Sequence, residues 1–322
     1  MHPRLVLAPI RGITDATFRR VFAAHFPGFD AALAPFLVED RGRKVRDRDV
    51  RAAAADWSNA LPTTPQILAR DAGSFLSIGR RLVEAGCPEL NWNLGCPHPL
   101  VTQRGRGAGL LAFPESIDAT LRQVLSALDV RLSVKLRLGL HKPEEILAVL
   151  DVFEGHDLHE VIVHPRTADQ MYGGSTDVEA FAALAGRTRH TLVYNGDITT
   201  LAVWERLRAR LPSVTRWMVG RGVLADPFLV SWMRGNPPAP GEELPRMQTF
   251  HDALLQEHGR AQAGPGHTLA KMQALWEYLP QSFDPKAKQV LKRIRKARTL
   301  SAYEYHVRAL FAGPAIWTAR PA

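Results

Sequence analysis

Cysteines and long apolar runs are scarce in this sequence, and each shortage excludes a class of protein. Only Cys87 and Cys96 occur in 322 residues, whereas a secreted disulfide scaffold needs many more cysteines. Two thiols without a matching histidine pair cannot build a structural zinc site. No apolar stretch reaches the ~18–20 residues that cross a bilayer, and the first residues lack a signal-peptide layout. We therefore expect a cytoplasmic protein with no metal and no membrane association.

Acidic residues are also in the minority. Lys and Arg total 41 against 32 Asp and Glu, which gives a formal charge of +9. Such an excess favours a polyanionic partner, with nucleic acid first. A GC-rich coding bias is the alternative, but it would spread the charge evenly, and the charge is concentrated near the C-terminus. The 46% hydrophobic and 23% charged residues are globular values, which excludes a disordered chain.

The first two-thirds of the chain alternates short apolar runs with segments of helical spacing, as repeated βα units do. The apolar runs are continuous, which is typical of parallel strands buried on both faces. Strands are predicted at Leu5–Ala8, Ala31–Phe36, Pro65–Leu68, Glu89–Asn93, Leu132–Leu136, Glu160–His164, Thr191–Tyr194 and Arg216–Val219. Eight strands in about 230 residues match an α/β fold of the (β/α)8 TIM-barrel type. An open doubly wound sheet is the alternative, but residues 8–12 lack the glycine fingerprint that it needs.

A Pro/Gly-rich segment at residues 235–242 is typical of a linker. Beyond it, helices are predicted at His251–Gln262, Leu269–Tyr278 and Lys286–Arg298, with no strand between them. We therefore predict a catalytic barrel over residues 1–240 and a small C-terminal all-α domain over residues 241–322.

The C-terminal domain ends in a strongly basic stretch. Between Lys286 and Arg308 there are eight basic residues and one acid, Glu304. A solvated helix face usually mixes charges to form i,i+4 pairs. This imbalance favours a surface that contacts phosphates.

Polar residues follow several of the predicted strands, where TIM barrels place their active sites. Lys135 lies within an otherwise apolar strand, so it carries a desolvation cost unless an anionic group meets it. Asn195-Gly196 and Gly220-Arg221-Gly222 follow the last two strands, where barrels commonly bind phosphate. A plain Asn-Gly turn is the alternative for the first of these.

Cys96 lies between Gly95 and Pro97, on a turn that leaves the fourth predicted strand. Cys87 is interpreted as a small buried hydrophobic residue, the commoner state of a free cysteine. An ordinary thiol is mostly protonated at neutral pH, so Cys96 could act as a proton donor or as a nucleophile. Spacing alone leaves both roles open.

These motifs resemble those of the FMN-dependent bacterial tRNA-dihydrouridine synthases, with the C-like subgroup as the expected branch. The resemblance spans residues 4 to about 230, and the basic helical tail is similar to the family's RNA-binding domain by position and charge. The motifs are Ala8-Pro9 with Gly12 and Thr14-Asp15, Asn93-Leu-Gly-Cys-Pro97, Gly107-Ala-Gly-Leu-Leu111, Val134-Lys-Leu-Arg-Leu-Gly139, Val163-His-Pro-Arg-Thr167, Asn195-Gly-Asp-Ile198 and Val219-Gly-Arg-Gly222. Ile10 stands where the family usually has Met, and Pro165 where a small residue is common.

The resemblance implies reduction of the C5=C6 bond of selected tRNA uridines by a monomeric enzyme, with FMN as cofactor and NADPH as electron donor. It assigns the proton donor to Cys96 and substrate contacts to Asn93 and Arg166. Flavin contacts are implied for Pro9, Ile10, Arg11, Gln66, Lys135, His164, Asn195, Gly196, Asp197, Gly220 and Arg221. The candidate tRNA contacts in the tail are Lys292, Arg293, Arg295 and Lys296.

Two other functions remain open from the sequence. An FMN barrel oxidoreductase acting on a small molecule, similar to dihydroorotate dehydrogenase or an ene-reductase, would explain Lys135 and the phosphate motifs but not the basic tail. An RNA-binding protein with a degenerate barrel would explain the tail but not Cys96, Lys135 and His164. The sequence does not say which uridine would be reduced.

Overall fold

A computed structural model of the protein describes residues 2–39, 43–260, 264–313 and 317–318. The chain divides into two compact units. The first unit comprises Met1–Pro9, Asp30–Asp197 and Leu207–Val219, and the second Ile10–Phe29, Ile198–Arg206 and Gly220–Ala322. The division of function at residue 240 remains a prediction.

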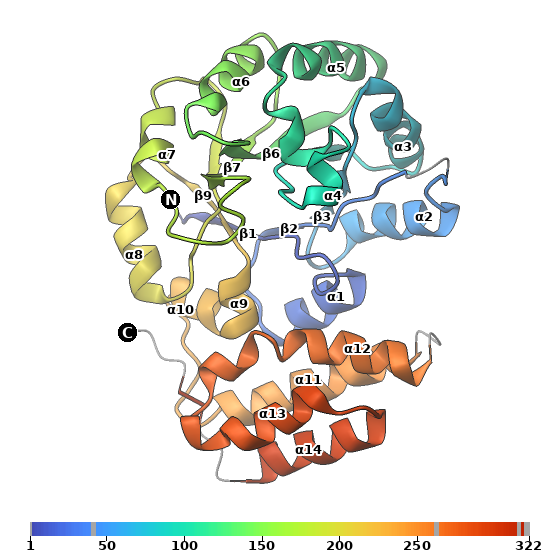
Figure 1. The fold of residues 1–322 in the computed structure, drawn as a ribbon. Helices are drawn as coiled ribbons and strands as arrows, with labels where there is room; N and C mark the ends of the chain where they lie inside the picture. The colour runs from blue at the N-terminus through green and yellow to red at the C-terminus, as the bar shows by residue number, and fades with distance from the viewer. Residues whose placement is uncertain (1, 40–42, 261–263, 314–316, 319–322) are drawn as a thin grey trace. The chain divides into compact units, whose positions relative to one another are not determined.

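A single sheet of parallel strands forms the centre of the first unit, and Figure 1 shows the helices α3, α5, α6 and α7 outside it. The strands are β1 (Arg4–Leu7), β2 (Ala31–Leu33), β3 (Thr63–Thr64), β4 (Gln66–Ile67), β5 (Glu89–Leu94), β6 (Arg131–Gly139), β7 (Val161–Thr167), β8 (Leu192–Tyr194) and β9 (Arg216–Val219). The helices of this unit are α2 (Asp47–Ala55), α3 (Ala72–Glu84), α4 (Pro99–Thr102), α5 (Pro114–Ala127), α6 (Glu145–Glu154) and α7 (Val178–Leu184).

The strand order, β3-β2-β1-β9-β8-β7-β6-β5-β4, closes the sheet on itself. Its two ends, β3 and β4, are consecutive in the chain and are separated only by Pro65. Proline has no N–H to donate to a ladder, so it divides one strand into two short pieces. The first piece pairs with β2 and the second with β5, while Leu37 bridges to Ile67 across the seam. The predicted eight-stranded barrel is therefore confirmed.

Every predicted strand is present, with ends that differ by a few residues. The strand predicted at Ala31–Phe36 ends at Leu33 because Pro35 follows shortly after it. The strand predicted at Leu132–Leu136 is longer, at Arg131–Gly139.

The interior of the barrel is apolar on one side and polar on the other. The apolar side is a single cluster of buried residues from β1, β2, β7, β8, β9 and the residue after β1, formed by Val6, Ala8, Leu33, Ile162, Val193 and Met218. The polar side comes from β4, β5 and β6 and consists of Gln66, Asn91, Asn93 and Ser133. A TIM-barrel interior is normally packed with branched apolar side chains, so the polar side marks where to look for chemistry.

Helices dominate the second unit. They are α1 (Ala16–His25), α9 (Arg221–Ala225), α10 (Leu229–Met233), α11 (Glu243–Arg260), α12 (Pro265–Leu275), α13 (Lys288–Lys296) and α14 (Leu300–Ala312). The remaining helix, α8 (Leu201–Arg210), has residues in both units. The last two residues of the helix predicted at His251–Gln262 lie outside the described part of the chain. The helix predicted at Lys286–Arg298 is shorter, because Pro285–Ala287 forms a 3-10 turn before α13 begins.

Helix α1 packs on α11 through phenylalanine rings. Phe18, Phe22 and Phe26 are each at most 1% exposed. All three meet the ring of Phe250 edge-on, with centroids 6.1, 5.9 and 5.1 Å away. Rings at these distances and angles add to the apolar burial between two helices. The α1 segment therefore shares its apolar core with the C-terminal helices.

None of the helices within the described ranges combines the length and the apolar character that a membrane crossing requires.

Candidate active site

Cys96 lies two residues beyond β5, at the carboxyl end of the strand, in a turn that is held from several sides. The side-chain oxygen of Asn93 accepts hydrogen bonds from the backbone N–H of Gly95 at 3.1 Å and of Cys96 at 2.9 Å. The carbonyl of Cys96 accepts from the N–H of Ala108 at 3.1 Å. The thiol-bearing residue is partly exposed. The sequence therefore fixes the Cys96 backbone while leaving its side chain accessible.

Asn93 begins a chain of side-chain hydrogen bonds across the polar side of the barrel. It donates to the oxygen of Gln66 at 2.8 Å, and the Gln66 amide donates to Asn91 at 2.7 Å. Asn91 donates to the hydroxyl of Ser133 at 2.8 Å, which reaches the carbonyl of Leu90. Each buried amide in this series has a partner, as burial requires. The series holds the Cys96 turn in register with β4 and β6.

Arg137 ties the Cys96 turn to the end of β7. Its Nε donates to the carbonyl of Gly95 at 3.2 Å, and Nη1 donates to the carbonyl of Thr167 at 2.8 Å. The guanidinium also lies 5.3 Å from the ring centre of Tyr172, whose side chain is exposed. Burial lowers the pKa of Arg137 to about 10, so the group stays charged at neutral pH. The predicted site residues include neither Arg137 nor Tyr172.

Lys135 faces the same region from β6, where it pairs in register with Asn93 of β5. Burial lowers the pKa of Lys135 to about 7; the neighbouring Arg137 cation adds to this, and Cys96 opposes it. Its ammonium has no hydrogen-bond or ion-pair partner within the described residues, although the side chain is only partly exposed. A desolvated ammonium in this state favours an anionic or acceptor ligand.

His164 lies on β7 and is buried, with its ring 6.3 Å from that of Tyr172. Arg137 pairs with His164 across β6 and β7. The structure therefore brings together Gln66, Asn93, Cys96, Lys135 and His164, five of the residues predicted from the sequence.

Arg166 is buried and its hydrogen bonds go to other parts of the protein. It forms a two-pronged pair with the carboxylate of Asp197, at 3.0 and 2.5 Å, and donates to the carbonyls of Gly173 and Gly174. Asp197 adopts a positive φ of 44°. This paired geometry holds the loop after β7 against the turn after β8. Arg166 thus has a positioning role that the sequence did not predict, and its contact with substrate remains a prediction.

The residues after β8 are also engaged in packing. The Asn195 amide donates to the carbonyl of Met218 at 2.8 Å and so links β8 to β9. A Cβ added to Gly196 would lie 2.6 Å from Thr176 and 3.2 Å from Pro165. Close packing alone therefore requires glycine here, whether or not a phosphate approaches.

The remaining predicted flavin contacts fall at the ends of β1 and β9. Pro9 is the last residue of the first of the three segments that form the first unit. Ile10 and Arg11 begin the first segment of the second unit, in a turn whose Gly12 has a φ of +87°. Gly220 and Arg221 follow β9 directly and open α9. Their roles remain predictions.

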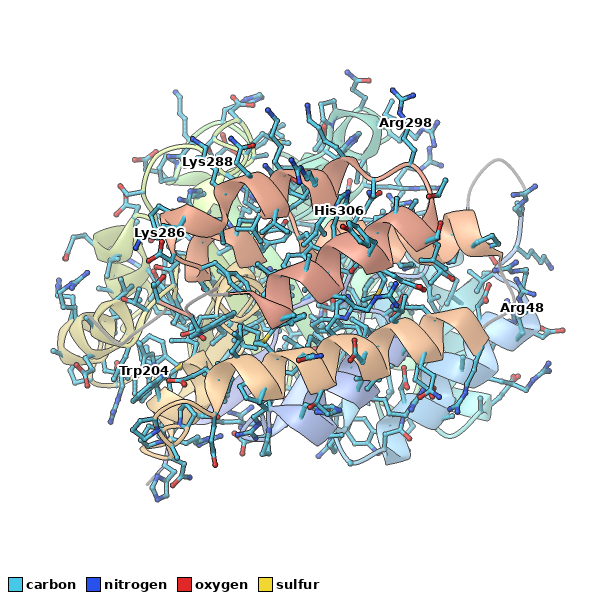
Figure 2. The ribbon with its side chains drawn as sticks, turned by 90° about the horizontal axis from the view of Figure 1, so that it is seen from below. Arg48, Trp204, Lys286, Lys288, Arg298 and His306 are labelled. Carbon is cyan, nitrogen blue, oxygen red and sulfur yellow. The ribbon has the colours of Figure 1, made fainter. Side chains whose placement is uncertain are left out.

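The basic residues of the C-terminal tail lie on the surface. All eight are exposed, and Figure 2 shows the side chains of Lys286, Lys288 and Arg298 pointing away from the ribbon. Leu291 and Ile294 of α13 are buried, so the helix separates an apolar face from a basic one. The only acid that pairs with this group in the described residues is Glu277, 3.6 Å from Arg295. This surface is suited to contacts with phosphates.

The other cysteine, Cys87, is buried, whereas Cys96 is partly exposed. Cys87 is 2% exposed, and burial raises its pKa to about 11. The structure confirms that it is a small apolar residue of the core. No cluster of potential metal ligands occurs among the residues that the structure describes.

The comparisons with known proteins agree on one family. The model of the family described as "Dihydrouridine synthase (Dus)" matches residues 6–306. The chain is 28% identical to a probable tRNA-dihydrouridine synthase of Rhodobacter capsulatus, over 94% of each protein. It is 29% identical to a tRNA-dihydrouridine(16) synthase of Ralstonia nicotianae, covering 72% of this chain and 73% of that one. It is 25% identical to tRNA-dihydrouridine synthase B of Escherichia coli, covering 86% and 87%. Because these relatives have names of different specificity, the C-like subgroup remains a prediction.

Two solved structures are similar in fold. Morphinone reductase has a TM-score of 0.51 and 13% identity, covering 73% of this chain and 86% of that one. The old yellow enzyme of Trypanosoma cruzi has a TM-score of 0.52 and 10% identity, covering 77% and 91%. At this identity the likeness shows the fold alone.

Proposed function

Because the chain belongs to the dihydrouridine synthase family, we propose that it reduces the C5=C6 bond of specific uridines in tRNA to 5,6-dihydrouridine. The observation that supports this most is that Lys135 lies in register with Asn93, whose side chain holds the backbone of the partly exposed Cys96. Reduction of a uracil needs a proton donor on one side and stabilisation of negative charge on the other. The side chains of Cys96 and Lys135 supply both at the polar side of one barrel.

The residues of the barrel fit a flavin mononucleotide. The ammonium of Lys135 would meet the electron-rich edge of the ring system, and the second amide hydrogen of Gln66 is left to bond to it. When bound, FMN supplies the hydride that reduces C6, and NADPH is the proposed electron donor. The residues that would hold it are Pro9, Ile10, Arg11, Gln66, Lys135, His164, Asn195, Gly196, Asp197, Gly220 and Arg221.

Cys96 holds the proton that C5 of the uracil must receive. A thiol carries an S–H proton, so Cys96 would act as the general acid. The hydrogen bonds from the backbone of Gly95 and Cys96 to the Asn93 oxygen hold the backbone that carries the thiol. Asn93 and Arg166 are the proposed residues that orient the substrate, Arg166 through its control of the loop at Gly173–Gly174.

The tRNA would be held by the exposed basic face of the C-terminal helices. A uridine must leave the folded RNA to reach Cys96, and unstacking carries an energetic cost that phosphate contacts offset. The proposed contacts are Lys292, Arg293, Arg295 and Lys296, all on α13. A cytoplasmic monomer is the expected working form.

The test is reduction of an unmodified tRNA transcript by the purified protein with FMN and NADPH, followed by mass-spectrometric mapping of dihydrouridine. We expect Cys96→Ala to retain flavin but to form dihydrouridine at least a hundredfold more slowly, the usual contribution of a general acid. Cys87→Ala is the matched control and should keep turnover, because this thiol is buried away from the site. Equal turnover of free uridine and transcript would instead favour an oxidoreductase acting on small molecules.

A further inference from the structure

The first unit has a cavity outside the site described above. It measures about 490 Å³ and is lined by the segment after β4 and by the chain from Gly105 to Gln123. Its lining includes Arg70, Gly73, Gly105, Phe113, Thr120 and Gln123. A cavity of this size is within the range of small-ligand sites, which hold molecules as large as a nucleotide.

The cavity shares one wall with the Cys96 turn. A Cβ on Gly105 would lie 3.6 Å from the Arg70 side chain, whereas a Cβ on Gly107 would lie 2.7 Å from the Cys96 carbonyl. Because β4 and β5 are paired neighbours, the segments that follow them leave the same end of the barrel. One short stretch, Arg104–Ala108, therefore lines the cavity at Gly105 and meets the Cys96 turn at Gly107 and Ala108.

The chemistry of the lining suits a nucleotide. Phe113 is 50% exposed, although phenylalanine is usually buried. The Arg70 side chain is 66% exposed and forms a 3.3 Å ion pair with the carboxylate of Asp71, a residue that also lines the cavity. The other N–H groups of the Arg70 guanidinium can meet a phosphate. Gln123 adds an exposed amide; its nitrogen donates to the carbonyl of Ala119 at 3.2 Å, and its oxygen can accept from a base edge. Aromatic rings and guanidinium groups are the side chains that commonly hold unstacked bases and their phosphates, and this cavity is lined by one of each.

We infer that this cavity is a second nucleotide subsite, which holds a residue of the substrate RNA close to the uridine at Cys96. The inference rests on the proposed function. The protein's net charge of +9 complements a polynucleotide, and an RNA strand entering at Cys96 has further nucleotides that must pass along the adjoining surface. A base stacked on Phe113 would help keep the reactive uridine out of the RNA fold.

The experiment measures the affinity of the FMN-loaded protein for fluorescent tRNA transcript by anisotropy, without reductant. Phe113→Leu keeps apolar bulk but removes the ring, and we expect it to weaken binding about tenfold. Phe113→Trp keeps a stacking surface and should bind as the wild type does. Arg70→Ala should weaken binding several-fold and lower the salt slope by about one.

Arg122→Ala is the matched control for Arg70. Arg122 is 73% exposed and pairs with Asp118 at 2.6 Å, but it does not line the cavity. Unchanged tRNA affinity in both Phe113→Leu and Arg70→Ala would overturn the inference. A raised KM for NADPH with unchanged tRNA affinity would also overturn it and assign the cavity to the reductant. If the wild type itself neither binds nor reduces transcript, the proposed function fails first.

Discussion

Alanine at position 107 should damage the active site far more than alanine at position 105, although both glycines have the same backbone conformation. Gly105 has a φ of +60° and Gly107 a φ of +56°. The left-handed region costs a residue with a Cβ roughly 1–2 kcal/mol. Both variants carry this cost, so the difference between them isolates what the new methyl group meets.

The methyl groups meet different surroundings. At position 105 the nearest atoms are in the flexible side chain of Arg70, at 3.6 Å, which is ordinary contact. At position 107 they are the carbonyl oxygen of Cys96 at 2.7 Å, the Cβ of Cys96 at 3.0 Å and the Cγ1 of Val101 at 3.0 Å. Carbon atoms prefer ~3.5–4.0 Å, so the Cys96 turn must move. Overpacking of this kind costs roughly 1–3 kcal/mol.

We therefore expect Gly105→Ala to lower the free energy of unfolding by about 1–2 kcal/mol and Gly107→Ala by about 2–5 kcal/mol. Urea unfolding of both variants measures this directly. Labelling with an aromatic disulfide reports on the turn, because Cys87 is buried and has a raised pKa and so leaves Cys96 as the reactive thiol. Labelling should be faster in Gly107→Ala, since its loop hydrogen bonds are strained, and dihydrouridine formation should fall at least tenfold below Gly105→Ala.

Equal losses of stability, with equal labelling and equal turnover in the two variants, would refute the reasoning. That result would mean that the turn yields to the methyl group without moving the thiol.

Three further variants test other parts of the site. Lys135→Met should raise the free energy of unfolding at pH 6 and weaken FMN binding. In the wild type the pKa of Lys135 is about 7 in the native state and higher in the unfolded state, so the free energy of unfolding rises from pH 7 to about 10. FMN binding that depends on the charged ammonium declines over the same pH range. Neutralising the four α13 residues at 292, 293, 295 and 296 should weaken tRNA binding and reduce the salt slope by up to about 4, measured by titration at several salt concentrations. Lys271 donates to the carbonyl of Gly12 at 3.0 Å and to Asp15 at 2.7 Å, so Lys271→Met should loosen the turn that carries Ile10 and Arg11 and weaken FMN binding several-fold by fluorescence titration.

Each of these has an outcome that would contradict it. Unchanged FMN affinity in Lys135→Met would show that the Lys135 ammonium does not contact the cofactor. Unchanged salt dependence in the α13 variant would move the tRNA contacts elsewhere. Lys271→Arg is the control for Lys271→Met, and equal FMN binding in both would show that the ion pair does not support the turn.

The sequence predicted the barrel because buried parallel strands appear as short apolar runs between loops, and eight such runs in about 230 residues match this fold. It also predicted Lys135, since a lysine within such a run is costly and so stands out. The local sequence pattern does not predict contacts between side chains that are distant in the chain. Arg137 and Tyr172 are 35 residues apart in the chain, and only the folded loop after β7 brings the ring to the guanidinium.

Two other features show what local pattern leaves out. Gly196 was predicted as a phosphate contact, but its immediate neighbours, Thr176 and Pro165, already exclude a side chain. Helix α14 was not predicted, although Thr299 caps it and Tyr303, Val307 and Leu310 give it a helical apolar spacing. This apolar spacing overlaps the basic stretch that ends at Arg308.

The packing of α1 on α11 determines where the chain can be truncated and which segments can be exchanged with those of a relative. A chain ended at residue 240 would keep Phe18, Phe22 and Phe26 but lose Phe250, the ring that all three contact. The truncated chain would therefore expose the apolar surface that these three rings form, and we expect it to aggregate during expression. Because α1 and α11 share one apolar core, exchanging the C-terminal helices with those of a relative would require exchanging α1 with them.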